Sequence, residues 1–394
     1  MRFCFTPILN ITIMIGCLAA SAQGHAKSRS ANGHFLIDHN RIFVELGFIR
    51  PDGSVRKTLA YVDSGDPNFE FTSRLAKELG VDKNNPIRAR FAGMDLKVNP
   101  QIEASASETE SMAAGMTVEA NLPSTVLDQY DVLLDYGKHS LTIAAPGTLQ
   151  HAGIRIPCKV NAKTGLLSVQ AKIGGGVYEF SVDNGAAYTW IDDAVTKKWV
   201  EMHPKWLRGT GAVGDANMNG SVPELTGMIM RLPEIDLDGL RLNSTGVLGV
   251  GPGWDATMPR FFKWYSQKTP APVTGFLGGN VLKDFCLEID YEHRATYWTR
   301  ETESNPHDLD QVGIMIVPRH GEYFVMGLAT QNGKVTVDGI EVNDQLLSVD
   351  GVTVTGTTMG KVLTALHGRP GEIRRLVLER NGESFSVSAR VTRF

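Results

Sequence analysis

The chain has 394 residues, with 39 basic and 43 acidic side chains and a formal net charge of -4. A chain of this length buries enough apolar surface for two or three domains, so its folding requires neither a metal ion nor dense disulfide bonding. The nearly balanced charge favours neither nucleic acid nor an anionic membrane surface as a partner.

The N-terminal segment has the pattern of a secretory signal peptide, which we expect over residues 1–22. Arg2 precedes an apolar stretch at residues 8–20, and Ala20-Ser21-Ala22 offers a small-residue cleavage site. The stretch is short for a bilayer span, which favours cleavage over a retained anchor, and Cys17 leaves lipoprotein anchoring as a further alternative. We therefore expect export to the periplasm or the extracellular space, no membrane span after cleavage, and a linker at residues 23–34.

A β-hairpin is expected next, and its second strand leads into Asp63. Apolar side chains alternate along the first strand at Ile42, Val44, Leu46 and Phe48. Residues 50–53, with the sequence Arg-Pro-Asp-Gly, supply the turn. A short helix is then predicted over residues 72–80, beginning with a hydroxyl cap and ending at a glycine.

The same order of elements recurs in the second half of the chain. A hairpin is predicted over residues 166–182, with its turn at Gly174-Gly175-Gly176, and its returning strand reaches Asp183. A helix over residues 194–200 follows, capped by Asp192 or Asp193.

Each copy closes with an Asp-Tyr pair at an expected hairpin turn, Asp135-Tyr136 in the first and Asp290-Tyr291 in the second. Three matches in the same order indicate an internal duplication. The second copy is longer between its aspartate and its Asp-Tyr pair, and the loop-rich region at residues 209–253 accounts for the insertion.

The duplication predicts that Asp63 and Asp183 meet as a catalytic dyad. Two neighbouring carboxyl groups share one proton, so one acts as a base toward water while the other, protonated, polarises a peptide carbonyl. Asp66 adds a third acid that would perturb their titration. The loops expected to position the dyad contain Ser64, Gly65, Asn184 and Gly185. The two glycines suit tight turns. Ser64 is expected to brace the turn by a hydrogen bond across a two-fold axis.

These motifs resemble a retropepsin-type or pepsin-type aspartic protease with both lobes in one chain. The resemblance covers residues 35–303 and implies a bilobal double β-barrel, with lobes at residues 35–149 and 150–303. It also implies hydrolysis of an extended protein or peptide without a metal or cofactor. The histidines show no zinc-ligand spacing, and no nucleophile-elbow serine is present.

The sequence departs from that family at two places. The family carries two apolar residues and a glycine beneath each aspartate loop; Phe276-Leu277-Gly278 matches this pattern, but residues 123–127 contain no such glycine. Asn184 stands where the family has threonine or serine, and an amide bonds with a different geometry from a hydroxyl. Two alternatives therefore stay open: lobes that bind peptide or act as a scaffold without catalysis, and two unrelated aspartates at turns.

Two structural details have competing expectations. A flap over the cleft is expected either at residues 87–98 or at residues 112–118. Cys158 and Cys286, the cysteines of the mature chain, either form a disulfide after export or remain separate buried thiols.

From residue 304 the pattern changes. The most specific residues of this part are Gly339-Ile340, Asn343-Asp344 and Val349-Asp350-Gly351. With these residues, the segment 311–394 resembles a PDZ domain of the bacterial form. The resemblance implies an α+β module at residues 304–394 that binds an extended peptide by strand addition and recruits substrate or regulates access. Its candidate peptide-binding residues are Tyr323, Phe324 and Val325. The alternative is a module that packs on the lobes and binds nothing.

Overall fold

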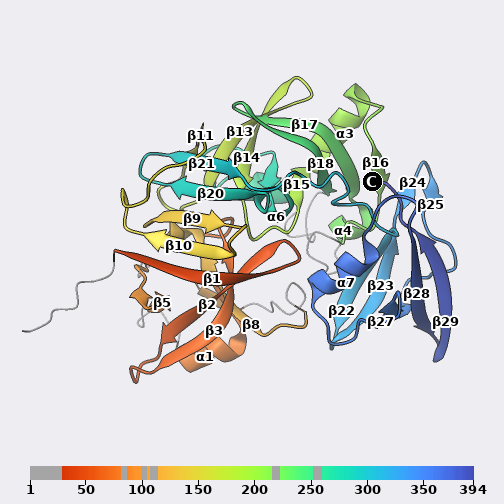
Figure 1. The fold of residues 1–394 in the computed structure, drawn as a ribbon, viewed down its shortest axis with the longest axis horizontal. Helices are drawn as coiled ribbons and strands as arrows, with labels where there is room; N and C mark the ends of the chain where they lie inside the picture. The colour runs from red at the N-terminus through yellow and green to blue at the C-terminus, as the bar shows by residue number, and fades with distance from the viewer. Residues whose placement is uncertain (1–28, 81–86, 99–103, 107–113, 215–221, 252–259) are drawn as a thin grey trace, which may run out of the picture.

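The structure, a computed structural model, describes residues 29–80, 87–98, 104–106, 114–214, 222–251 and 260–394 (Figure 1). These residues form a mostly β protein, which confirms the predicted fold class at that level. The predicted signal peptide lies outside the described residues. The predicted linker is partly structured, because β1 (Ser30–Asp38) begins inside it. No helix in the described ranges is long and apolar enough to cross a bilayer.

The largest sheet has 13 strands drawn from both halves of the chain. Besides β1 it contains β2 (Arg41–Ile49), β3 (Val55–Asp63), β4 (Phe69–Phe71), β5 (Ala89–Phe91), β6 (Met94–Asp95), β7 (Ala104–Ala106), β8 (Val118–Pro123), β9 (Asp131–Asp135), β10 (Ser140–Ala144), β11 (Ile154–Pro157), β20 (Phe285–Asp290) and β21 (Ala295–Arg300). Its order is β11-β21-β20-β9-β10-β1-β2-β3-β8-β4-β7, with β5 paired to β2 and β6 to β5.

The predicted first hairpin is formed by β2 and β3, which pair antiparallel from Phe43 opposite Tyr61 to Ile49 opposite Val55. The four alternating apolar residues of β2 are all buried in the main core. Asp63 is the last residue of β3, so the hairpin delivers its carboxylate to the end of a strand.

The two copies of the duplicated pattern meet at β9 and β20. These strands pair antiparallel, with Val132 opposite Ile289 and Asp131 opposite Asp290. Each strand ends in the aspartate of its Asp-Tyr pair. In the turns that follow, Asp135 accepts a hydrogen bond from Lys138 N, and Asp290 accepts one from His293 N. The two copies are therefore joined along one continuous sheet.

The second sheet has ten strands. They are β12 (Lys159–Val160), β13 (Leu167–Ile173), β14 (Gly176–Val182), β15 (Thr189–Asp192), β16 (Arg208–Thr210), β17 (Met228–Leu237), β18 (Leu240–Val250), β19 (Gly275–Leu277), β24 (Thr330–Gln331) and β25 (Lys334–Val335). The last two come from the C-terminal part of the chain and join through Thr210 opposite Thr330. The predicted C-terminal module therefore shares a sheet with the second copy.

A third sheet of six strands lies beside the others and is drawn in blue in Figure 1. It contains β22 (Ile314–Arg319), β23 (Glu322–Leu328), β26 (Gln345–Val349), β27 (Val352–Thr353), β28 (Ile373–Arg380) and β29 (Glu383–Arg390). Its own core includes the buried face of α7 (Met359–Leu366), and α7 also contacts β1.

Short helices connect the strands. They are α1 (Ser73–Leu79), α2 (Ser124–Leu127), α3 (Asp193–Met202), α4 (Val222–Thr226), α5 (Phe261–Tyr265) and α6 (Gly279–Leu282). Thr72 caps α1 through a hydrogen bond from Leu75 N, and Gly80 ends it with φ 59°. Asp192, rather than Asp193, caps α3.

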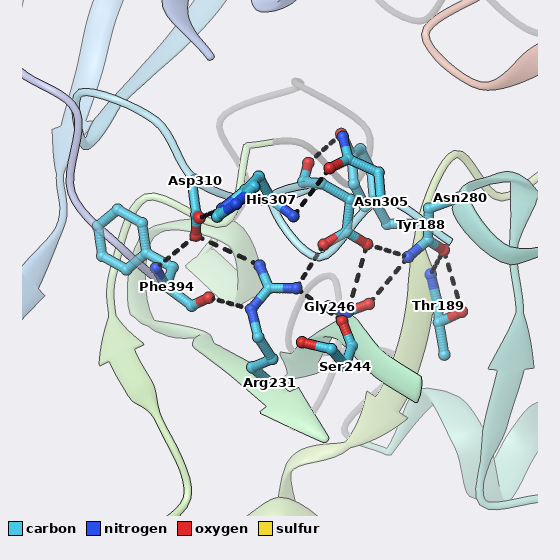
Figure 2. Close-up of polar contacts among 11 residues, drawn as sticks. Tyr188, Thr189, Arg231, Ser244, Gly246, Asn280, Asn305, His307, Asp310 and Phe394 are labelled. Carbon is cyan, nitrogen blue, oxygen red and sulfur yellow. Dashed lines mark hydrogen bonds and ion pairs between the residues drawn. The ribbon is translucent and has the colours of Figure 1, made fainter. Parts of the chain in front are cut away.

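A buried polar network ties the second sheet to the C-terminal part of the chain (Figure 2). Arg231 of β17 forms ion pairs with Asp308 and Asp310 at 2.8 and 3.3 Å. Its guanidinium also donates to the carbonyl oxygens of Phe394 and Ser244. All of these acceptors belong to other segments, so one arginine holds several parts of the chain together.

Candidate active site

The structure brings Asp63 and Asp183 together at the ends of equivalent strands. Asp63 ends β3, which pairs in parallel with β8, and Asp183 follows β14, which pairs in parallel with β19. Each carboxyl group lies against the glycine of the opposite turn, and the charge of Asp183 raises the pKa of Asp63. The paired strands therefore place both aspartates at one point between the two copies.

Gly65 and Gly185 are required by this close approach rather than by their φ angles. A Cβ on Gly65 would lie 2.3 Å from the carboxyl carbon of Asp183, and one on Gly185 would lie 2.4 Å from Asp63 Oδ1. Their N–H groups donate to the aspartate of their own turn, each at 2.9 Å. Each glycine thus leaves room for the carboxylate of the opposite turn, and its N–H group binds the carboxylate of its own turn.

Ser64 and Asn184 join the two loops through reciprocal hydrogen bonds. Ser64 N donates to Asn184 Oδ1 at 2.8 Å, while Asn184 N donates to Ser64 Oγ at 3.2 Å. Ser64 Oγ in turn donates to the carbonyl oxygen of Val182 at 3.0 Å. Asn184 thus supplies an acceptor to the opposite loop. Its Nδ2 is buried and has no hydrogen-bond partner among the described residues.

Replacing Ser64 with alanine is expected to lower the free energy of unfolding by about 1–3 kcal/mol, because Asn184 N and Val182 O would both be buried without a partner. Urea denaturation followed by fluorescence measures the change. Ser54→Ala at an exposed turn is the control and should shift the midpoint little. Equal midpoints for Ser64→Ala and the wild type would contradict the bracing role.

Both aspartates hold protons more tightly than an ordinary carboxyl group. Burial raises the pKa of Asp63 well above its usual value, and the negative charges of Asp183 and Asp66 add to the effect. Burial also raises the pKa of Asp183, to about 6, but hydrogen bonds from Ala186 N and Gly185 N and the charge of Arg41 oppose it. Asp183 is therefore the better site for the negative charge and Asp63 for the shared proton.

Arg41 and Tyr265 complete the site, and the sequence analysis missed both. Arg41 is 1% exposed, and its Nε donates to the carbonyl oxygen of Gly185 at 2.6 Å. The Tyr265 hydroxyl donates to the carbonyl oxygen of Gly65 at 2.8 Å. The two side chains thus hold equivalent carbonyl groups of the two loops, and Arg41 adds a positive charge behind Asp183.

A cavity of about 370 Å³ opens beside the dyad. Its lining includes the acids Asp66 and Glu70 and the cation Lys268, whose Nζ lies 4.1 Å from the centre of the Trp264 ring. Burial raises the pKa of Asp66 to about 7. The aromatic side chains of the lining are Tyr61, Trp190, Phe261, Trp264, Tyr265 and Phe276. The cavity can therefore hold a large side chain next to the two carboxyl groups.

Neither predicted flap segment lines this cavity in the described part of the chain. Residues 89–95 form the β5–β6 hairpin, which pairs with β2 through Leu46 opposite Phe91. Residues 112 and 113 of the second candidate lie outside the described residues, and Gly115 contacts the backbone at Thr357.

The glycine missing from the first copy is replaced by Pro123. Ser124 N donates to the carbonyl oxygen of Asp66 and Gly279 N to that of Ala186, so Pro123 and Gly278 occupy equivalent positions. A Cβ on Gly278 would lie 2.2 Å from the carbonyl oxygen of Tyr188. The glycine is thus needed in the second copy alone, where the backbone of Tyr188 comes close.

The candidate peptide-binding residues of the C-terminal part lie on an interior strand. Tyr323 of β23 pairs with Pro318 on one side and Leu346 on the other, and Phe324 likewise has neighbours on both sides. Val325 is fully buried, with its N–H bonded to Asp344 O. A peptide added as a strand needs a free edge, and β23 offers none at these three residues.

Asp135, Cys286 and Glu301 lie close enough to hold a metal ion. Their oxygen atoms already have protein donors, since Lys138 Nζ binds Asp135 and Gly137 N binds Glu301. Burial also raises the pKa of the Cys286 thiol to about 11. Oxygen atoms of both carboxylates in this cluster are thus already bound by donors of the protein. Cys158 and Cys286 are free thiols in the structure, as in the second of the two cysteine alternatives, but only Cys158 is buried and Cys286 is half-buried.

A scan against protein-family models finds no match to this chain, and a search of curated proteins finds no relative. The functional argument therefore depends on the geometry of the site.

Proposed function

We propose that the chain is an aspartic endopeptidase, similar to single-chain retropepsin-type or pepsin-type enzymes. The observation that carries the proposal is the pair Asp63 and Asp183, whose carboxyl groups each lie against the opposite turn, on equivalent turns that are braced across the two copies. Paired carboxyl groups with one shared proton activate water without a covalent intermediate.

In the mechanism we propose, Asp183 is the base and Asp63 the acid. Asp183 accepts two backbone hydrogen bonds and faces Arg41, so it carries the negative charge and takes a proton from the attacking water. Asp63 keeps its proton and donates it to the carbonyl oxygen of the scissile bond as the tetrahedral intermediate forms. The proton taken by Asp183 then passes to the leaving nitrogen as the C–N bond breaks, and Asp63 takes back a proton from a hydroxyl of the intermediate, which leaves a carboxylic acid and restores the dyad with one proton.

The proposed substrate is a protein or peptide in an extended conformation. A large aromatic or aliphatic side chain next to the scissile bond would contact Trp190 and Phe276 in the cavity beside the dyad. Burying such a side chain contributes about 1.5–3 kcal/mol, which would orient the bond over the carboxyl groups.

The finer architecture belongs to the same proposal. The antiparallel seam of β9 and β20 and the matching β3–β8 and β14–β19 pairs support two related barrel-like lobes at residues 35–149 and 150–303. The sheet and helix of residues 304–394 support a PDZ-like module that regulates access or recruits substrate. Export to the periplasm or beyond follows from the signal-like N-terminus.

The second candidate function is peptide binding without hydrolysis, in a scaffold of the cell envelope. It is favoured by the buried, unpartnered Nδ2 of Asn184, because an unsatisfied donor beneath a catalytic dyad weakens its support. The two functions share a cleft and differ only in turnover.

Incubation with a peptide library in the presence of a chelator tests the proposal, with cleavage products identified by mass spectrometry. We expect cleavage by the wild type and none by the double variant Asp63→Asn/Asp183→Asn. Binding of library peptides without cleavage would support the scaffold, and equal cleavage by both proteins would exclude the dyad.

The activity is expected to be low in acid and to rise as the pH passes about 6. Burial raises the pKa of Asp183 to about 6 and that of Asp63 well above its usual value, so in acid both groups hold their protons and no base is available to the attacking water. A pH profile of kcat/KM measures this, and a maximum below about pH 4, where unperturbed aspartates titrate, would contradict it.

The same two groups affect stability. Because their pKa values are higher in the folded chain than in the unfolded chain, their contribution is fully present below about pH 4 and is lost as the pH rises through about 6.

A further inference from the structure

A second and larger cavity lies away from the dyad, between α7 and the turn that joins β1 to β2. It has a volume of about 1110 Å³ and is also bordered by residues 305–308 of the connector to the third sheet. This volume is at the upper end of the range for small-molecule pockets, about 300–1000 Å³, so it suits a ligand longer than one compact group.

The carboxylates that line this cavity already have protein partners. Asp38 accepts hydrogen bonds from Thr358 Oγ1 and Gly360 N at the start of α7. Asp308 is paired with Arg231, and Glu372 with Arg374 at 2.9 Å. Asp308 and Glu372 therefore have cationic partners within the protein, whereas Asp38 is held by neutral donors.

Three cations of the same lining have no ion-pair partner among the described residues: Lys283, Lys361 and Arg369. Lys283 Nζ contacts only a neutral acceptor, Asn40 Oδ1, at 2.8 Å. Burial lowers the pKa of Lys283, and a bound anion would offset that cost. Lys361 and Arg369 are exposed at the cavity rim. The lining thus carries four cations, Lys283, Lys361, Arg369 and Arg374, against the three carboxylates Asp38, Asp308 and Glu372, which leaves an excess of positive charge.

The cations are spread along the cavity rather than gathered at one point. Lys361 lies in the first turn of α7, about 7.5 Å along the helix axis from Leu366, the last residue of α7, and Arg369 lies three residues beyond Leu366. An extended peptide covers the helical part of that distance in about two or three residues. Pro306, which is exposed and lines the cavity, offers apolar surface to the intervening side chains.

We propose that this cavity binds an acidic segment of an extended peptide, whose carboxylates pair with Lys283, Lys361 and Arg369. The spacing suits several separated carboxylates better than one compact anion. The site is distinct from the dyad, and its occupation does not require hydrolysis.

The cavity also reaches the dyad through two contacts. His39 lines it, His39 Nδ1 lies 2.8 Å from Arg41 Nη1, and Arg41 holds the carbonyl oxygen of Gly185. A peptide bound here would therefore contact His39, the neighbour of the side chain that supports the turn of Asp183.

Fluorescence anisotropy with a labelled peptide of alternating glutamate and alanine, about eight residues long, tests the proposal on the full chain. We expect saturable binding that weakens at high salt. Lys361→Glu and Arg369→Glu should each weaken it by about ten-fold. Lys198→Glu, at an exposed position of α3 outside the cavity, is the matched control and should change affinity less than about two-fold. Circular dichroism checks folding, and mass spectrometry checks that the peptide stays intact.

The proposal is overturned if the peptide does not bind at low salt, or if Lys198→Glu weakens binding as much as Lys361→Glu does. It is also overturned if inorganic phosphate displaces the peptide at similar concentrations, since the site would then bind a compact anion. The experiment measures binding and not cleavage. A lack of binding would therefore leave the hydrolysis proposal unaffected, and a lack of hydrolysis would leave the proposed acidic-peptide site unaffected.

Discussion

Replacing Asp183 with asparagine is expected to lower kcat/KM about 10²- to 10⁴-fold, the usual contribution of a positioned acid or base. An amide cannot take a proton from water, so the hydrogen bonds from Gly185 N and Ala186 N would support a neutral group with no basic role. The Asn side chain has nearly the same size and keeps an oxygen acceptor for these donors. The loss should therefore appear in kcat, with KM little changed.

Asp238→Asn is the matched control for this experiment. Asp238 lies in an exposed turn between β17 and β18 with φ 50°, a conformation that asparagine adopts readily. It removes the same charge far from the dyad and should leave kcat/KM within about two-fold of the wild type. If Asp183→Asn and Asp238→Asn cleave equally well, Asp183 does not act as the base and the proposed dyad mechanism is wrong.

The meeting of Asp63 and Asp183 could be predicted from the sequence because its signals are local and repeated. Each aspartate follows an alternating strand, precedes a capped helix and belongs to a copy that ends in an Asp-Tyr turn. Patterns of this kind depend on neighbours in the chain, and a duplicated order implies pairing of the copies.

Arg41 and Tyr265 could not be predicted in the same way. Arg41 is 144 residues from Gly185, and Tyr265 is 200 residues from Gly65. A charged residue at the start of a strand is normally exposed, so the sequence gives no sign of the burial that makes Arg41 important. Contacts of this kind depend on how the sheets pack and not on the local pattern.

The close approach of the opposite carboxylates to Gly65 and Gly185 could not be predicted from the sequence either. Glycine at a turn predicts a permissive backbone, whereas the structure gives these two residues a different reason, the opposite carboxylate. The sequence also could not show that β23 has a neighbouring strand on each side, because the order of strands in a sheet depends on the whole fold.

Replacing Arg231 with alanine is expected to lower the free energy of unfolding by about 3–5 kcal/mol, the typical cost of breaking a buried ion pair from one side. Arg231 is 5% exposed, and Asp308 and Asp310 would both remain buried without their cation. The carbonyl oxygens of Phe394 and Ser244 would lose their donors as well (Figure 2). Urea or thermal denaturation measures the loss.

Two further variants separate charge from packing in this network. Arg231→Met keeps most of the buried apolar volume, so a loss close to that of Arg231→Ala would identify the unpaired carboxylates as the cause. Arg241→Ala is the control, because its guanidinium is exposed and 3.9 Å from Glu234, and it should cost less than about 1 kcal/mol. If Arg231→Ala is as stable as Arg241→Ala, the network is not what joins the third sheet to the second, and the apolar contacts of Met315, Val317 and Phe394 would be sufficient.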